Sequence, residues 1–398
     1  MAVTETTTES WGSRLGSSIR GVLVGGALFI AGFPVLFWNE GNSVKTAKAI
    51  DEGEGACISL ESNATVDPEM NGKLVHMSGK ADTQDVLSDD QFGVSATAIR
   101  LERKVEMYQW LEESRTSEKK KMGGSVERTT TYTYKKAWLD YPVDSSGFKE
   151  QGHDNPGSME FTSDKMYASN VSFGAFKLSK DQIERIGSAQ AYAFPTDFVC
   201  KVERAKRQGG TIYIPNAETR GNALNNRDVV SQTRIGDMRV TFSVVYPHEI
   251  SLIAKQHGDT FVAYTAKNGK KLSYMAEGVQ DAAAMFETAR TNNAIMTWLI
   301  RLGGFLMMYF GLSMVFKPLS VLADVLPILG DIVGIGTSLV AGLIALISAL
   351  VTIAIAWIFF RPILGIILLA AAGFLVWMLI KKRMEAKKAA QATAGAVE

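Results

Sequence analysis

The chain has 398 residues, with 42 basic and 41 acidic side chains and a formal net charge of +1. That balance gives no general argument for nucleic-acid binding or for an acidic substrate, and the length allows two or three domains. The hydrophobic share of 46% hides a split, because the middle of the chain is polar while long apolar runs lie near its two ends.

The N-terminal region predicts a disordered start followed by a membrane span. Residues 1–18 are rich in Thr, Ser and Glu, and we expect them to be disordered. Residues 19–38 are long and apolar enough to cross a bilayer, and Trp38 suits the membrane interface. A signal peptide is the competing interpretation, but the run ends in Phe37-Trp38-Asn39-Glu40, which is a poor cleavage site. We therefore expect an uncleaved transmembrane helix.

The polar middle, residues 39–293, predicts a large β-rich domain outside the membrane. Two alternating runs, 103–112 and 129–140, flank the polar residues 119–124 and indicate a long β-hairpin. Four further strands are expected at 239–245, 250–256, 260–264 and 271–275, and helices at 179–188 and 278–293. Residues 72–76 and 236–240 open their strands in a similar way, through a weak internal duplication or as two unrelated strands. Cys57 and Cys200 either form one disulfide or are two buried thiols.

The C-terminal fifth predicts three more spans. Residues 295–316, 332–360 and 362–380 are each long enough to cross a bilayer. Residues 319–336 are apolar but interrupted, and we expect an interfacial or re-entrant helix pair there. The fold class is therefore α+β: a helical integral membrane protein with four transmembrane helices and a large β-rich extramembrane domain between the first two.

Charged residues in this block are the candidate site. Arg301 lies near the start of its span beside Trp298, a second interface anchor, so we expect Arg301 to reach the headgroups rather than to stay buried. Asp324 and Asp331 are expected at the aqueous boundary, and Arg361 marks the end of the third span. Glu40 lies at the same surface as Arg301, but we expect it to be solvated rather than paired.

Flanking charge predicts the orientation. The tail at 381–398 contains five basic residues within its first eight, so it is expected in the cytoplasm. Four spans then put the N-terminus in the cytoplasm and the β-rich domain in the periplasm or in a lumen. Lys45 and Lys48, just after the first span, weigh against this orientation.

Short motifs spread over nearly the whole chain resemble the transmembrane protein 43 family. The motifs are Asn39-Glu40-Gly41, Gly72-Lys73-Leu74-Val75-His76, Val105-Glu106-Met107-Tyr108-Gln109-Trp110, Asn155-Pro156, the run from Gly236 to Ser243, Gln256-His257-Gly258-Asp259, Thr297-Trp298 and Arg361-Pro362. The resemblance implies a similar layout of one span, a large domain and three spans. In animals it implies the endoplasmic reticulum and inner nuclear membrane, with a role in organising membrane protein complexes, including partners of emerin and lamin type. It supplies no catalytic residues.

No motif indicates catalysis, and no cofactor or metal site is expected. The four histidines lack zinc-site spacing, and phosphate-loop and nucleophile-elbow motifs are missing from the sequence. The leading hypothesis is a membrane-anchored scaffold or sensor, not an enzyme, with membrane lipids, membrane or envelope proteins and copies of itself as partners and no nucleic acid.

Two other functions stay open. A channel or transporter subunit is suggested by Arg301, Asp324 and Asp331, and a hydrolase would need scattered residues such as His153 and Asp154. The expected location is a bacterial inner membrane with the domain in the periplasm, or the endoplasmic reticulum or inner nuclear membrane in a eukaryote.

Overall fold

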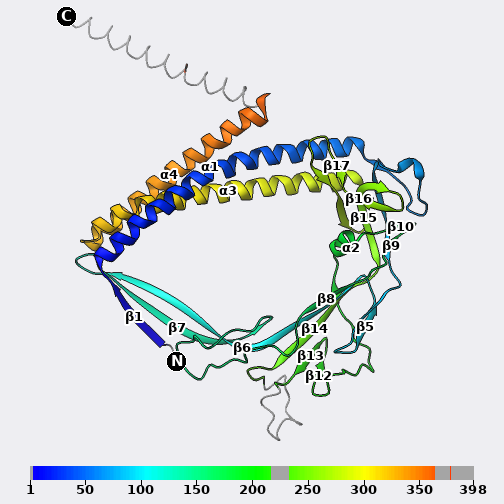
Figure 1. The fold of residues 1–398 in the computed structure, drawn as a ribbon, viewed down its shortest axis with the longest axis horizontal. Coiled ribbons are helices and arrows are strands. Elements are labelled where there is room, and N and C mark those ends of the chain that lie inside the picture. Colours follow the sequence, from blue (N-terminus) through cyan, green and yellow to red (C-terminus); the bar gives the residue numbers. More distant parts are fainter. Residues whose placement is uncertain (1–2, 217–232, 364–376, 378–398) are drawn as a thin grey trace, which may run out of the picture. The chain divides into compact units, whose positions relative to one another are not determined.

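The computed structural model describes residues 3–216, 233–363 and 377. The chain folds into long helices and many β-strands (Figure 1), and it divides into two compact units. One unit is rich in strands and comprises residues 1–8, 49–119 and 127–289. The other comprises residues 9–48, 120–126 and 290–398 and contains the long apolar helices; we call it the membrane unit. The boundaries between the units fall at the end of the first strand, inside two of the helices and at the tip of one hairpin.

The β-rich unit contains two large sheets. The eight-stranded sheet has the order β1-β7-β6-β14-β13-β12, with β8 on β6 and β11 on β14. Its strands are β1 (Val3–Glu9), β6 (Arg100–Lys120), β7 (Val126–Leu139), β8 (Asp164–Tyr167), β11 (Gln190–Ala191), β12 (Lys206–Gln208), β13 (Thr211–Ile214) and β14 (Met238–Val245). Alternate residues of β6 and β14 are buried, as expected for strands with one face on a core. Leu101, Val105, Val240 and Phe242 belong to that core.

The seven-stranded sheet has the order β10-β9-β3-β15-β16, with β19 on β15 and β2 on β3. Its strands are β2 (Ile58–Ser59), β3 (Leu74–Asp82), β9 (Ser172–Phe173), β10 (Phe176–Lys177), β15 (His248–His257), β16 (Thr260–Val262) and β19 (Tyr274–Glu277). Two small hairpins pair β4 (Val86–Asp89) with β5 (Val94–Thr97) and β17 (Tyr264–Thr265) with β18 (Lys271–Leu272). The central strand β15 is almost continuously buried because both its faces pack on hydrophobic clusters, Ile250, Leu252 and Ala254 on one and Ile253 on the other.

Several predicted elements of this unit are present. The long hairpin is formed by β6 and β7, and its turn at Gly123 and Gly124 has the positive φ angles that glycine tolerates. The short helix α2 (Lys180–Arg185) begins at Ser179, whose side chain forms a capping box with Gln182. A one-turn helix, η1 (Pro68–Met70), precedes β3. The expected meander is interrupted, since β14 and β15 are neighbours in sequence but belong to different sheets.

The two similar strand openings take equivalent places in the two sheets. Gly72 and Gly236 have φ angles of +83° and +87°. The N–H of Gly72 donates to the backbone carbonyl oxygen of Gln256 on β15. The N–H of Gly236 donates to that of Tyr108 on β6, and each bond is 2.8 Å long. The strands that follow, β3 and β14, each pair antiparallel with that partner. This repeated geometry is what an internal duplication would produce.

The membrane unit contains three helices that are long and apolar enough to cross a bilayer. They are α1 (Trp11–Ala56), α3 (Ala282–Ala323) and α4 (Pro327–Phe360). The buried residues between them include Leu36, Met308 and Leu312, which pack on the small side chains Ala341 and Ala345 of α4. The fourth span expected at 362–380 and the tail at 381–398 lie largely outside the described residues, so only three spanning helices are supported.

Two expectations for this chain are corrected by the structure. The predicted disordered start is ordered from residue 3, because the Thr-rich segment of β1 suits a strand and pairs with β7. The interfacial or re-entrant helix pair predicted at 319–336 is not a separate element: α3 continues to Ala323 and α4 begins at Pro327. A proline costs little in the first helical turn, where its missing N–H has no intrahelical partner, so the interruption is a tight turn.

Candidate functional site in the membrane unit

Glu40 and Arg301 form a buried ion pair between α1 and α3. Arg301 Nε and an Nη atom donate to the two carboxylate oxygens of Glu40 at 2.6 and 2.8 Å, and the Glu40 side chain has no exposed surface. The indole Nε1 of Trp357 on α4 donates to the same carboxylate at 2.8 Å. The expectations of a solvated Glu40 and a headgroup-facing Arg301 are therefore wrong, because each charge satisfies the other.

Aromatic rings surround this pair. The guanidinium carbon of Arg301 lies 4.6 Å from the ring centre of Trp298 and 5.7 Å from that of Trp357. Arg361 approaches the Trp357 ring at 5.9 Å. We call Glu40, Arg301, Trp298, Trp357 and Arg361 the Glu40 cluster. Trp38 and Trp298 are both largely exposed, as interface anchors would be.

Polar side chains extend the Glu40 cluster along the α1–α3 contact. Asn39 donates to the Thr297 carbonyl oxygen at 3.1 Å, and the Thr297 hydroxyl lies 2.8 Å from that of Ser43. Asn293 donates to the Ser43 carbonyl oxygen at 3.1 Å. Sequence reasoning missed this row, although Asn293, Thr297 and Arg301 recur every four residues and so share one helix face.

A second charged cluster joins the other ends of the same helices. Asp324 is buried and accepts hydrogen bonds from Arg14 at 2.5 Å and from Lys120 at 2.6 Å. Lys120 also donates to Asp331 at 2.8 Å, while the Asp331 side chain keeps 66% of its surface exposed. We call Arg14, Lys120, Asp324 and Asp331 the Asp324 cluster. The expectation of an aqueous boundary is wrong for Asp324, which two cations neutralise.

The tip of the β6–β7 hairpin belongs to this cluster. Arg14 also donates to the Gly124 carbonyl oxygen at 2.6 Å, and the Gly123 N–H donates to Val325. Burial alone would lower the pKa of Lys120, but its bonds to Asp324 and Asp331 outweigh burial and raise that pKa. Lys120 therefore remains a cation at physiological pH.

The two clusters lie at opposite ends of the apolar part of each helix. Arg14 and Glu40 are about 39 Å apart along α1, at 1.5 Å per residue. The hydrocarbon core of a bilayer is about 30 Å thick. The spacing fits charges held near the two membrane surfaces, with the apolar turns between them.

The two cysteines are free thiols. Cys57 packs against the hydrophobic cluster of Ile50 and Leu74, whereas Cys200 packs on the separate core of the eight-stranded sheet. The structure therefore contains no bond between them, and the disulfide interpretation is wrong because different cores hold the two residues. Burial raises the pKa of Cys57 to about 11 and also raises the pKa of Cys200.

His153, one of the residues considered for a hydrolase, lies among aromatic rings. The His153 ring stacks on Tyr134 at 4.0 Å and meets the Trp110 ring edge-on at 4.4 Å, and its Nδ1 atom is buried with no hydrogen-bond partner. No group of three or more His, Cys, Asp or Glu residues suited to a metal ion occurs in the described part of the chain.

The apolar helices, their paired charges and the β-rich unit define a membrane protein with a large extramembrane part. The chain belongs to the transmembrane protein 43 family, whose model, described as Transmembrane protein 43, matches residues 107–362. It is 32% identical to Transmembrane protein 43 of Mus musculus and 31% identical to that of Homo sapiens, covering 94% of this chain and 93% of each relative. The Transmembrane protein 43 homolog of Drosophila melanogaster is 29% identical over 89% of this chain and 93% of its own length. No solved structure matches the chain.

Proposed function

We propose that this protein is a membrane-anchored scaffold or sensor that organises protein complexes at its membrane, without catalytic activity of its own. The observation that carries the proposal is the pairing of Arg301 with Glu40 and of Asp324 with Arg14 and Lys120. Charges used in this way fix the packing of three helices. They hold the anchor in one arrangement and leave the β-rich unit as the part that meets other molecules.

One face of the eight-stranded sheet offers a surface for protein partners. The Trp138 ring on β7 lies 5.1 Å from Tyr108 on β6 and 6.4 Å from Tyr213 on β13, and the Arg239 guanidinium lies 4.8 Å from Trp138. All four residues are half-buried. Tyr, Trp and Arg are enriched in the cores of protein interfaces and among their hot spots. We propose this aromatic face as the contact for membrane-associated proteins, further copies of the chain included.

The relatives favour one of the two expected locations. The three named above are animal proteins, so they give no support to a bacterial inner membrane. A place in the endoplasmic reticulum or inner nuclear membrane fits them and is our proposal for the location.

Site-specific cross-linking tests the scaffold. A photoreactive residue at Tyr108 in the full-length protein is expected to give discrete adducts with other membrane proteins or with a second copy. The double change Trp138→Ala and Arg239→Ala is expected to reduce the adducts at least tenfold, whereas Lys180→Ala, an exposed change on α2, leaves them unchanged. Protein that remains monomeric and yields no adduct would refute the proposal.

The alternative is a channel or transporter subunit, and the exposed carboxylate of Asp331 is the observation that favours it. Purified protein in liposomes would then carry an ion flux that Asp331→Ala abolishes. Liposomes without flux would remove this alternative.

A further inference from the structure

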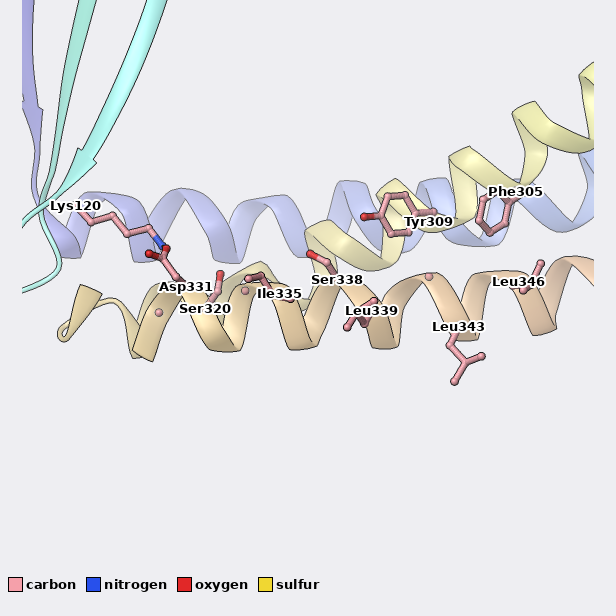
Figure 2. Close-up of a pocket in the computed structure, with 13 residues that line it drawn as sticks. Lys120, Phe305, Tyr309, Ser320, Asp331, Ile335, Ser338, Leu339, Leu343 and Leu346 are labelled. Carbon is pink, nitrogen blue, oxygen red and sulfur yellow. The ribbon is translucent and has the colours of Figure 1, made fainter. Parts of the chain in front are cut away.

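A polar cavity of about 380 Å³ lies in the β-rich unit, where β3 ends and β9 begins. Its polar lining includes Asp82, Gln84, Asp85, Asn170, Ser172 and Lys177. A larger groove of about 950 Å³ in the membrane unit differs from it, because Tyr309, Leu339 and Leu343 give that groove an apolar wall that suits lipid tails in general (Figure 2). The smaller cavity therefore offers the more selective surroundings.

The segment Asn170-Val171-Ser172 beside this cavity matches the acceptor sequence for N-linked glycans, Asn-X-Ser/Thr. The chain contains one other such sequence, Asn63-Ala64-Thr65. A motif of three residues recurs by chance, so its presence alone does not identify a modified site. The two asparagines, however, differ sharply in their surroundings.

Asn170 is exposed, while its backbone is held in place. Its N–H donates to the Asp85 carboxylate at 2.8 Å, and its carbonyl oxygen accepts from the Thr83 hydroxyl at 2.6 Å. Its Nδ2 atom donates to Asp85 at 3.2 Å. An amide nitrogen carries two hydrogens and a glycan replaces one, so this bond survives the modification. Val171 is buried in the core of the seven-stranded sheet, whereas Ser172 is exposed.

Asn63 has no room for a sugar. Its Nδ2 atom is buried without a hydrogen-bond partner, and a Cβ at Gly79 would collide with that atom. A Cβ at Gly174 would collide with the backbone oxygen of Asn63, which accepts from the Ala175 N–H at 2.8 Å. A site too tight for one more carbon cannot hold a sugar. A chain modified at Asn63 could not complete this part of the fold.

We propose that the folded protein carries an N-linked glycan at Asn170 and none at Asn63. This inference rests on the proposed location, since both residues belong to the β-rich unit and the basic tail predicts that this unit lies in the lumen. The proximal sugar lies over the polar cavity, where Asp82, Gln84 and Lys177 offer acceptors and donors to its hydroxyls.

The transfer needs a donor and an enzyme of the host, but no oxidant or reductant. The donor is an oligosaccharide linked to a polyprenyl diphosphate. A bond forms between the Asn170 Nδ2 atom and the anomeric carbon of the oligosaccharide, and the bond from that carbon to the diphosphate oxygen breaks. The polyprenyl diphosphate leaves with the electron pair of that bond, and the amide gives up one proton.

The full-length protein produced in animal cells tests the choice between the two sites. Glycopeptide mass spectrometry of the purified, folded protein is expected to find a glycan at Asn170 at least tenfold more often than at Asn63. Ser172→Ala is expected to abolish the glycan although Asn170 itself is retained, whereas Ser172→Thr, which keeps a hydroxyl, is expected to preserve it. Equal occupancy of Asn63 and Asn170 would overturn the proposal.

Asp144→Asn separates an error about the site from an error about the compartment. This change creates the acceptor sequence Asn-Ser-Ser at an exposed position of the same unit, and an amide oxygen can keep the bond that Asp144 accepts from the Ser146 N–H. Glycans are expected at both position 144 and Asn170. A glycan at position 144 with none at Asn170 would overturn the assignment of Asn170 and leave the location standing. A glycan at neither would overturn both.

Discussion

Glu40 has no exposed surface and accepts hydrogen bonds from both Arg301 and Trp357. Truncation or neutralisation of one member of a buried ion pair leaves the other charge without compensation, at a cost of about 3–5 kcal/mol. Glu40→Gln is therefore expected to lower the free energy of unfolding of the membrane unit by about that amount. Unfolding in detergent, followed by tryptophan fluorescence, measures it.

Two further variants serve as the control and as the rescue in this experiment. The exposed Glu61→Gln is expected to have no effect. The double change Glu40→Leu/Arg301→Met is expected to recover most of the loss, since apolar residues of similar size often replace a buried pair without cost. A Glu40→Gln protein as stable as the unmodified one would show that the pair does not hold the helices.

Glu277, the last residue of β19, provides a pH-dependent contribution to stability. Burial alone would raise its pKa, but bonds from the Ser188 hydroxyl, the Gly187 N–H and the His248 ring outweigh burial and hold the pKa below its ordinary value. A carboxyl whose pKa is lower in the folded chain stabilises the fold above its unfolded pKa of about 4.5. That contribution is lost as the pH falls through the folded-state value.

The expected outcome for Glu277→Gln follows from the lowered pKa of Glu277 in the folded chain. The variant is expected to be less stable than the unmodified protein at pH 7, and the difference is expected to shrink as the pH falls below about 4.5. Denaturant titrations between pH 3 and 7 measure it, with the exposed neighbour Glu249→Gln as control. A difference that stays constant over that range would contradict the assignment.

At the scale of elements, two adjacent glycines of α1 differ sharply in their surroundings. A Cβ at Gly25 would lie 2.5 Å from the Gly311 carbonyl oxygen, and one at Gly311 would lie 2.7 Å from the Gly25 carbonyl oxygen. A Cβ at Gly26 meets nothing within 4 Å. Gly25→Ala is therefore expected to push α1 and α3 apart and destabilise the membrane unit. Gly26→Ala is expected to be neutral or to stabilise it by up to about 1 kcal/mol. Equal effects in the same unfolding assay would contradict this helix crossing.

The sequence predicts elements well where local rules decide them. The β6–β7 hairpin follows from alternation around a glycine-containing turn, and the capping box at Ser179 follows from residue spacing. Partners far apart in sequence were not predictable in this way. The bonds of Glu40 to Arg301 and of Lys120 to Asp324 connect residues separated by more than 200 positions, and local pattern carries no information on such pairs. The two cysteines show the same limit, because the sequence alone did not reveal that Cys57 and Cys200 pack in different cores.

At the scale of the whole molecule, the hairpin tip bears on membrane orientation. Residues 120–126 contact Arg14 and the α3–α4 turn. The strands behind the tip carry Glu112, Glu113 and Arg115, and charged strands with open edges do not lie in hydrocarbon. These contacts would put the hairpin tip on the same side of the membrane as the start of α1, whereas an α1 that crosses the bilayer puts residues 14 and 120 on opposite sides, as the basic tail also predicts.

Thiol labelling in sealed proteoliposomes decides between these two orientations. Ser13→Cys and Met122→Cys, both at exposed positions, are expected to react with a membrane-impermeant maleimide from opposite sides, because α1 lies between them and is apolar enough to cross the bilayer. Labelling from the same side would show that α1 does not cross the membrane.

The half-buried, unpaired state of Cys57 has a practical consequence for such work. With a pKa of about 11, roughly one Cys57 thiol in a few thousand is a thiolate at pH 7.5, and the thiolate is the form that attacks maleimides and disulfides. A cysteine introduced at the surface is therefore expected to react with a maleimide well before Cys57 does.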